Sequence, residues 1–243
     1  MNPKGTVNQI TNKSSLWDSN SRMLLKEQYD RFYRDSDFKY YSEKTTRRFL
    51  KALLGKGRVL NGAKILDVGC GTAFYTDQLR ALGFNVIGVD ISAVGVLKGR
   101  TRYPSLSLVV GDSSTMPFRC NSFDVLFMNG CSLANTHDIQ TLRSYISYLR
   151  QFLKNTGALL LMGQSDFSGG TAANSEWIYH SYDEILKFVD QEKVIADGPY
   201  VTNLRLLSSL GRAGLNMVVS WLARVFPGNR KWSFVYYIRK RQD

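Results

Sequence analysis

Between residues 64 and 163 the sequence alternates short apolar runs with segments of helical spacing, and this alternation constrains the fold more than any other feature. The apolar runs are AKILDVG, NVIGVD, LSLVVGD, FDVLFMNG and ALLLMG. Strands that are apolar on both faces are typical of a parallel sheet covered by helices. The sequence therefore predicts an α/β fold, with a mostly parallel sheet and helices on both of its faces.

Helical spacing is clearest at residues 139–157, where apolar side chains recur at Leu142, Tyr145, Ile146, Leu149 and Leu153. Gly83 and Gly157 each follow a helical segment, at the position where glycine commonly ends a helix. Further upstream, residues 41–54 open with Ser42 in the place of an N-cap. We therefore expect a helix at each of these places.

Outside the alternating core, the chain divides into segments of different character. Residues 1–15 are polar and predict a flexible tail, and residues 16–60 predict an N-terminal helical cap. Residues 61–243 predict one α/β domain, whose last third adds strands at 193–202 and 232–241.

Residues 203–226, between those last two strands, are rich in Leu and Val and carry Arg205, Arg212 and Arg224. Three interpretations are open for this apolar helical insertion. It is a lid over a substrate pocket, an interfacial helix that meets anionic head groups of a membrane, or an oligomer surface.

The net charge of +12 is concentrated at the two ends of the chain. Residues 1–60 carry 13 basic and 6 acidic side chains, and residues 200–243 carry 8 and 1. Basic ends suit an anionic partner such as nucleic acid, phospholipid or a phosphorylated substrate, whereas scattered Lys and Arg are equally typical of a solvated surface.

Several function classes are disfavoured by what the sequence lacks. There is no run of roughly 18 uncharged apolar residues for a membrane-spanning helix, and the first twenty residues have no secretory core. Three cysteines and two histidines, without CxxC or HxxxH spacing, predict neither a disulfide framework nor a metal site. We expect a cytoplasmic protein, with surface contact to a membrane through residues 203–226 as the alternative.

The motif that carries chemistry is a glycine-rich turn between a predicted strand and a predicted helix. Asp67 ends the strand, and Gly69 and Gly71 follow, so that the backbone is free to approach a ligand closely. Nineteen residues beyond Gly71, Asp90 ends the next strand, where a carboxylate accepts hydrogen bonds from ribose hydroxyls. This arrangement predicts a site for a nucleoside-bearing cofactor.

The surrounding residues narrow the choice of cofactor. A dinucleotide fingerprint requires a third glycine at position 74, which is Phe74, and no GK[ST] phosphate loop is present. Asp67 would also repel a pyrophosphate. A carboxylate at this point instead suits a cofactor with positive charge, such as a sulfonium that carries an α-amino group.

The stretches ILDVGCGTAFYT, VIGVDIS, VVGDSSTMPF and FDVLFMNG, in this order and spacing, resemble the class I S-adenosylmethionine-dependent methyltransferases. The resemblance covers roughly residues 40–200. It implies a Rossmann-like sheet of seven strands, with the last antiparallel, and makes residues 61–243 the methyltransferase domain. Ala73 stands where the family usually has its third glycine.

The resemblance also implies a role for individual residues. Asp67, Gly69 and Gly71 match the motif around the methionine part of S-adenosylmethionine. The remaining matches are Asp90 with the ribose, Ile91 beside the adenine, Asp112 and Ser113 at the adenine amino group, and Asn129 at the strand end that faces the sulfonium.

Residues 129–138 resemble a substrate-side stretch of some small-molecule methyltransferases. Asn135 replaces a common histidine of that stretch, and His137 lies close by as a candidate general base. Asn135 and His137 are therefore the candidate catalytic residues, and an ordinary loop histidine is the alternative interpretation of His137. The NPPY-type signature of many amino-group methyltransferases is absent.

Together these features predict a methyltransferase that uses S-adenosylmethionine and acts on a small molecule, of a lipid-linked or sugar-containing kind. One alternative is an RNA or protein methyltransferase that holds its substrate with the basic ends. A second alternative is a non-catalytic scaffold with the same fold. The sequence does not fix the acceptor or the oligomeric state.

Overall fold

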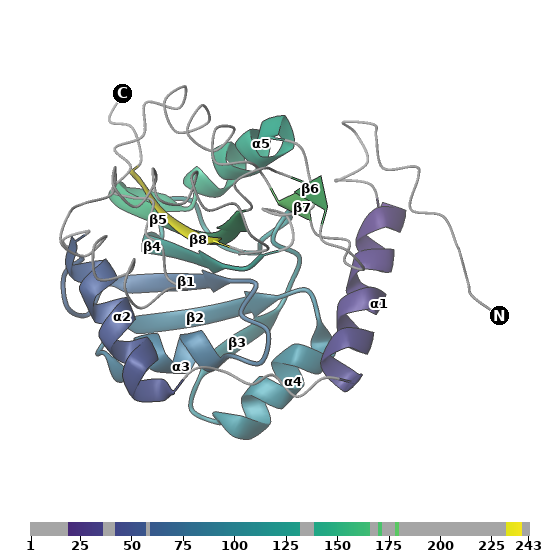
Figure 1. Ribbon diagram of the computed structural model, residues 1–243, viewed down its shortest axis with the longest axis horizontal. Coiled ribbons are helices and arrows are strands. Elements are labelled where there is room, and N and C mark those ends of the chain that lie inside the picture. Colours follow the sequence, from purple (N-terminus) through teal and green to yellow (C-terminus); the bar gives the residue numbers. More distant parts are fainter. Residues whose placement is uncertain are drawn as a thin grey trace.

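The computed structural model describes residues 19–35, 42–56, 59–131, 139–165, 170–171, 178–179 and 232–239. In this part of the chain, five helices and a central sheet alternate along the sequence as predicted (Figure 1). The helices are α1 (Ser19–Asp35), α2 (Glu43–Lys56), α3 (Phe74–Ala81), α4 (Ala93–Arg102) and α5 (Ile139–Arg150). The strands are β1 (Lys64–Val68), β2 (Asn85–Asp90), β3 (Ser107–Val110), β4 (Phe123–Asn129), β5 (Leu153–Ser165), β6 (Gly170–Thr171), β7 (Ile178–Tyr179) and β8 (Trp232–Arg239).

Six of these strands form one sheet in the order β3-β2-β1-β4-β5-β8. The first five are parallel, and β8 pairs antiparallel with β5, as the family resemblance implied for the last strand. The sheet of the described residues thus has six strands rather than the predicted seven. The strand expected at 193–202 and the insertion expected at 203–226 lie outside the described residues.

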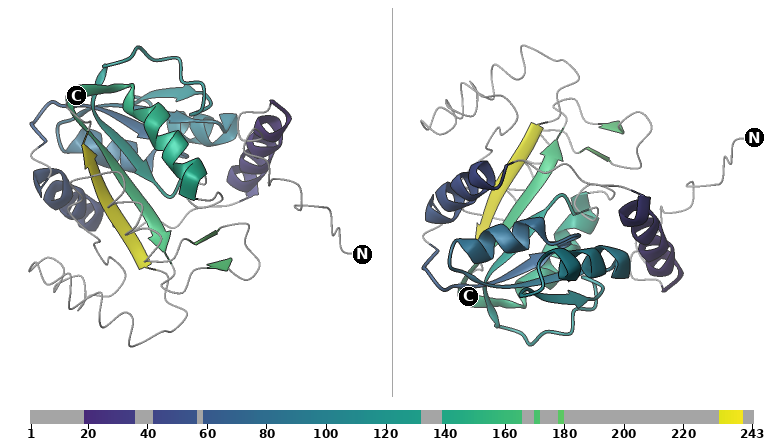
Figure 2. Two further views of the ribbon diagram at one scale, coloured as in Figure 1. Left: turned by 90° about the horizontal axis from the view of Figure 1, so that it is seen from above. Right: turned by 90° about the horizontal axis from the view of Figure 1, so that it is seen from below.

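Side chains of successive strand residues enter two different cores, because neighbouring positions on a strand face opposite sides of the sheet. Leu66 and Leu126 pack with α5 on one face, whereas Ile65 and Phe127 pack with α2 and α3 on the other. Seen from above, α5 lies in front of the sheet, and from below α3 and α4 do (Figure 2). The predicted coverage of both faces is therefore confirmed.

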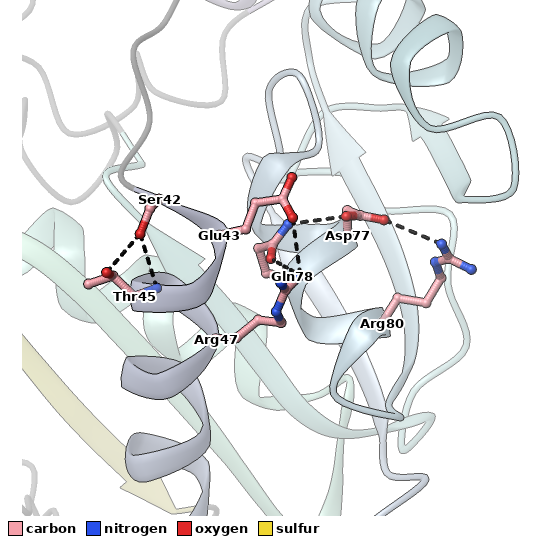
Figure 3. A network of polar contacts seen from close by, with 7 residues as sticks. All are labelled: Ser42, Glu43, Thr45, Arg47, Asp77, Gln78 and Arg80. Atoms are coloured by element: carbon pink, nitrogen blue, oxygen red, sulfur yellow. Dashed lines mark hydrogen bonds and ion pairs between the residues drawn. The ribbon is translucent and has the colours of Figure 1, made fainter.

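The N-terminal helical segment is held to the core by polar contacts. Ser42 caps α2 as predicted, since its Oγ accepts a hydrogen bond from the backbone N–H of Thr45 at 3.3 Å. One turn later, Arg47 donates to Glu43 on its own helix and to the buried Gln78 on α3, at 3.2 and 2.9 Å (Figure 3). Arg47 thus ties α2 to the helix that follows the glycine turn.

One predicted boundary was wrong. The spacing of apolar residues predicted a helix through Leu153, but α5 ends at Arg150 and Leu153 is the first residue of β5, paired with Phe123 of β4. The chain turns at Gln151 and Phe152, whose carbonyl oxygens accept hydrogen bonds from the backbone before β4. Leu153 is buried in either structure, so the hydrophobic pattern does not mark the change.

We expect Gly88→Ala to destabilise the fold. The added Cβ would lie 2.8 Å from Leu108 Cδ2 and 2.9 Å from Cys70 Sγ, and overpacking of this kind costs about 1–3 kcal/mol. Urea unfolding of the two proteins measures the difference. Gly55→Ala is the matched control, because its Cβ meets no atom within 4 Å and alanine is favoured in a helix. Equal stability of the Gly88→Ala and parent proteins would contradict the close packing described for this site.

Candidate functional site

The carboxyl ends of the parallel strands meet at one edge of the sheet, and the predicted site residues follow them. The strand order reverses between β1 and β4, which is where ligands bind in open α/β sheets. Figure 1 shows α1 standing beyond the edge toward which β1, β2 and β3 point. The candidate site therefore has a floor made of strand ends and a wall made of α1.

The turn after β1 has a left-handed backbone at three positions, a conformation that favours glycine. Gly69, Gly71 and Ala73 all have positive φ, at 76°, 53° and 65°. The N–H groups of Gly69 and Cys70 donate to the carbonyl oxygen of Val89 on β2, at 2.8 and 3.1 Å, and so fix the turn against the next strand. Ala73 precedes α3 in the left-handed region, where a non-glycine residue is strained.

Asp90, predicted to hold a ribose, is built into this turn. One carboxylate oxygen accepts a hydrogen bond from the Gly71 N–H and the other from the Ser92 N–H, each at 2.8 Å. Burial raises the pKa of Asp90, and these two hydrogen bonds partly offset the shift. A carboxylate offers about four lone-pair directions, so acceptor capacity remains for hydroxyl donors.

Asp67 lies deeper than the sequence alone indicated. It is 2% exposed, and its Oδ2 accepts a hydrogen bond from Thr76 Oγ1 of α3 at 2.6 Å. Burial raises the pKa of Asp67 to about 7, the Thr76 hydrogen bond opposes the shift, and the nearby Asp90 adds to it. The carboxylate of Asp67 therefore points to α3 and lies beneath the turn.

Ile91, Asp112 and the end of β3 border an open hollow of about 340 Å³ that α1 lines on the other side. The lining residues are Arg22, Met23 and Lys26 from α1, and Ile91, Val110, Gly111, Asp112 and Thr115 from the core. Asp112 Oδ1 accepts from the Ser114 N–H at 2.8 Å. Asp112 Oδ2 pairs with Arg22 Nη1 at 3.6 Å. Ser113, half-buried, lies between Asp112 and Ser114 in this turn.

The end of β4 lies beside the glycine turn. Asn129 is the last residue of β4, and the next residue, Gly130, donates its N–H to the Met162 carbonyl at 2.9 Å. A Cβ built on Gly69 would lie 3.7 Å from Cys131, so the first and fourth strand ends are neighbours. The structure therefore brings the predicted cofactor residues to one edge. Asn135 and His137 lie outside the described residues.

Two α1 residues that the sequence did not single out belong to this site. Arg22 reaches Asp112, and Asp30 Oδ1 accepts hydrogen bonds from Ser92 Oγ and from the Val94 N–H. The aromatic ring of Tyr33, on the same helix, lies against Gly71 and Gly95. The sequence held one indication of this, because the spacing of Arg22, Asp30 and Tyr33 places all three on one face of a helix.

Two features are absent from the residue ranges that the structure describes. In those ranges no group of three or more His, Cys, Asp and Glu side chains is placed to hold a metal ion. Among the helices of the described ranges, none has the length and hydrophobicity to span a bilayer.

A parallel α/β sheet with this turn, and with acids after successive strands, defines a nucleoside-binding domain of the Rossmann-like class. Residues 65–157 match the family model described as a methyltransferase domain. For this segment, the resemblance to class I S-adenosylmethionine-dependent methyltransferases is confirmed.

Curated relatives match over part of their length. A demethylmenaquinone methyltransferase from Renibacterium salmoninarum is 33% identical over 82 residues, which are 33% of this chain and 34% of that protein. One from Staphylococcus saprophyticus is 36% identical over 123 residues, 47% and 50% of the two chains. This chain thus spans between a third and a half of the length of these relatives.

Solved structures share the fold over more of the chain. Geranyl diphosphate C-methyltransferase from Streptomyces coelicolor A3(2), solved with S-adenosyl-L-homocysteine, superposes with a TM-score of 0.61 at 16% identity, covering 89% of this chain and 98% of that one. The PH0226 protein from Pyrococcus horikoshii OT3 gives 0.60 at 16% identity, covering 89% and 99%. At this identity the likeness establishes the fold alone.

We expect Asp67→Asn to stabilise the protein more at pH 8 than at pH 5. The folded-state pKa of about 7 lies above the ordinary value of 3.8, so the stability due to protonated Asp67 is full below about pH 4 and is lost progressively as the pH rises from there through 7. Asparagine is never ionised and still accepts from Thr76, which leaves an advantage on the order of a few kcal/mol at pH 8. Thermal melts at both pH values measure this, and an equal shift at both would contradict it.

Proposed function

We propose that this protein is a methyltransferase that transfers the methyl group of S-adenosylmethionine to a small molecule. The observation that carries the proposal is the unfilled acceptor capacity of Asp90, held beside a glycine turn at the reversal point of the sheet. The family match over residues 65–157 and the names of the relatives support it.

In this proposal each predicted residue takes one part of the cofactor. Asp90 accepts the ribose hydroxyls, and Ile91 and Asp112, with Ser113, take the adenine. Gly69 and Gly71 admit the methionine part, Asn129 faces the sulfonium, and Asp67 balances its positive charge from below. Gly71 has a left-handed backbone, and a Cβ there would lie 2.5 Å from Tyr33 Oη, so the Tyr33 ring covers this side of the turn and the position has no room for a side chain.

The chemistry requires alignment more than it requires acid–base groups. When bound, S-adenosylmethionine supplies a methyl group on a positively charged sulfur. The glycine turn would hold the methionine part and Asp90 the ribose, so that the methyl group between them is aligned, and α1 would cover part of the site. A base is needed only for a protonated acceptor, and Asn135 and His137 remain our candidates for that role.

For the acceptor we propose a lipid-linked small molecule, with a sugar-containing one as the other form. Demethylmenaquinone methyltransferases and a malonyl-acyl-carrier-protein O-methyltransferase from Erwinia billingiae, 32% identical over 68 residues, are among the relatives. The apolar, arginine-bearing segment 203–226 supports an apolar acceptor and surface contact with a membrane from the cytoplasmic side.

The first test is cofactor binding measured by calorimetry. We expect micromolar binding of S-adenosylmethionine, and a loss of about 1–3 kcal/mol, roughly 5- to 150-fold in Kd, for Asp90→Ala. Asp124→Ala is the matched control, since Asp124 pairs with Lys154 and the Lys64 N–H at the opposite edge of the sheet. Asp90→Asn, which keeps one carbonyl oxygen, guards against a variant that fails to fold. Equal affinity in the Asp90 and Asp124 variants would refute the placement.

The second test identifies the acceptor. The protein is incubated with methyl-labelled S-adenosylmethionine and, separately, with isoprenoid quinols, glycolipids, total RNA and a protein mixture. We expect label in the lipid fractions. Label in RNA, with binding that weakens steeply as salt is added, would support the nucleic-acid alternative instead. Binding without transfer to any acceptor would support a scaffold.

A further inference from the structure

The C-terminal half of α1 is fastened to α4 by caps that run in both directions. Asp30 of α1 accepts from Ser92 Oγ and from the Val94 N–H, at the N-terminus of α4. In return, Lys98 of α4 donates to the carbonyl oxygens of Tyr33 and Arg34, at the C-terminus of α1. Each helix therefore satisfies end groups that the other leaves unpaired. This reciprocal cap fixes α1 at the ribose end of the site.

At the other end of α1, Arg22 contacts the proposed adenine acceptor itself. Arg22 and Tyr33 are eleven residues apart, about 16 Å along a helix axis, so α1 spans the site from Asp112 to Gly71. Asp112 Oδ1 is already occupied by the Ser114 N–H, and Oδ2 is the oxygen that pairs with Arg22. Arg22 and Asp112 line the same hollow, so a base whose amino group reaches Asp112 would enter the space that the guanidinium takes.

We propose that Arg22 is a latch, which pairs with Asp112 and must release it when the nucleoside binds. This inference rests on the function proposed above. The guanidinium and an adenine amino group are both N–H donors that approach Asp112 from the same hollow, so they compete for the space in front of its carboxylate. The side chains of Arg22 and Asp112 are 29% and 21% exposed, which leaves the ion pair weak enough to exchange. Arg22, which lies on α1 and not in the motifs at the strand ends, thus sets the affinity for the nucleoside.

The test is calorimetry with S-adenosylhomocysteine. This ligand lacks the positive sulfonium charge, so removing the positive charge of Arg22 does not change its affinity by relieving repulsion between the two cations. Arg22→Met keeps an unbranched stem against the hollow and removes the competing donors. We expect its Kd to fall about two- to fivefold, the range of a partly exposed ion pair. Arg31→Met, which removes the same charge from an exposed position of α1, is the control and should leave Kd unchanged.

A double-mutant cycle separates the latch from a general effect of charge or packing. In an Asp112→Asn background, Arg22→Met should no longer tighten binding, because the ion pair is already absent. The proposal is overturned if Arg22→Met leaves Kd unchanged or raises it, if Arg31→Met tightens binding equally, or if the tightening persists in the Asp112→Asn background. Failure of the parent protein to bind S-adenosylhomocysteine would instead overturn the proposed function, and the latch with it.

Discussion

The site depends on the closure of the turn after β1 onto the end of β2. Two N–H groups of the turn donate to Val89, and Asp90 accepts from Gly71 in return. The side chain proposed to bind the ribose is therefore also a structural element of the loop that admits the rest of the ligand. Because one carboxylate performs both tasks, the acid and the glycine turn are positioned together by the pairing of β1 with β2.

Much of this arrangement was readable in the sequence because it depends on local patterns. Five apolar runs predicted the five parallel strands. The spacing of nineteen residues between Gly71 and Asp90 predicted that these two residues serve one site. The end of α5 was misplaced because Phe152 and Leu153 are buried in either a helix or a strand, and only their pairing with residues before and within β4 decides between the two. Burial alone carries no information on backbone type.

Long-range contacts account for what the sequence did not reveal. Asp67 was expected beside a ligand, yet Thr76 and the core around it hold its carboxylate beneath the turn. Arg22 and Asp30 carry no motif, and their place in the site follows from the packing of α1 against α4, more than sixty residues away. The spacing of residues on a helix predicts which side chains share a face, but it does not predict the part of the protein against which that face packs.

Several features around this turn destabilise the folded protein. Ala73 has a left-handed backbone without being glycine, and two carboxylates with raised pKa values are buried close together. Each of these features destabilises an empty site, and a cationic ligand would relieve the electrostatic part, because positive charge favours ionised Asp67 and Asp90. The strain at Ala73 has a different basis, since it positions the start of α3 and persists with or without a ligand. The buried carboxylates of Asp67 and Asp90 therefore favour a cationic ligand, and the left-handed backbone of the turn gives the ligand access. These two contributions come from different residues.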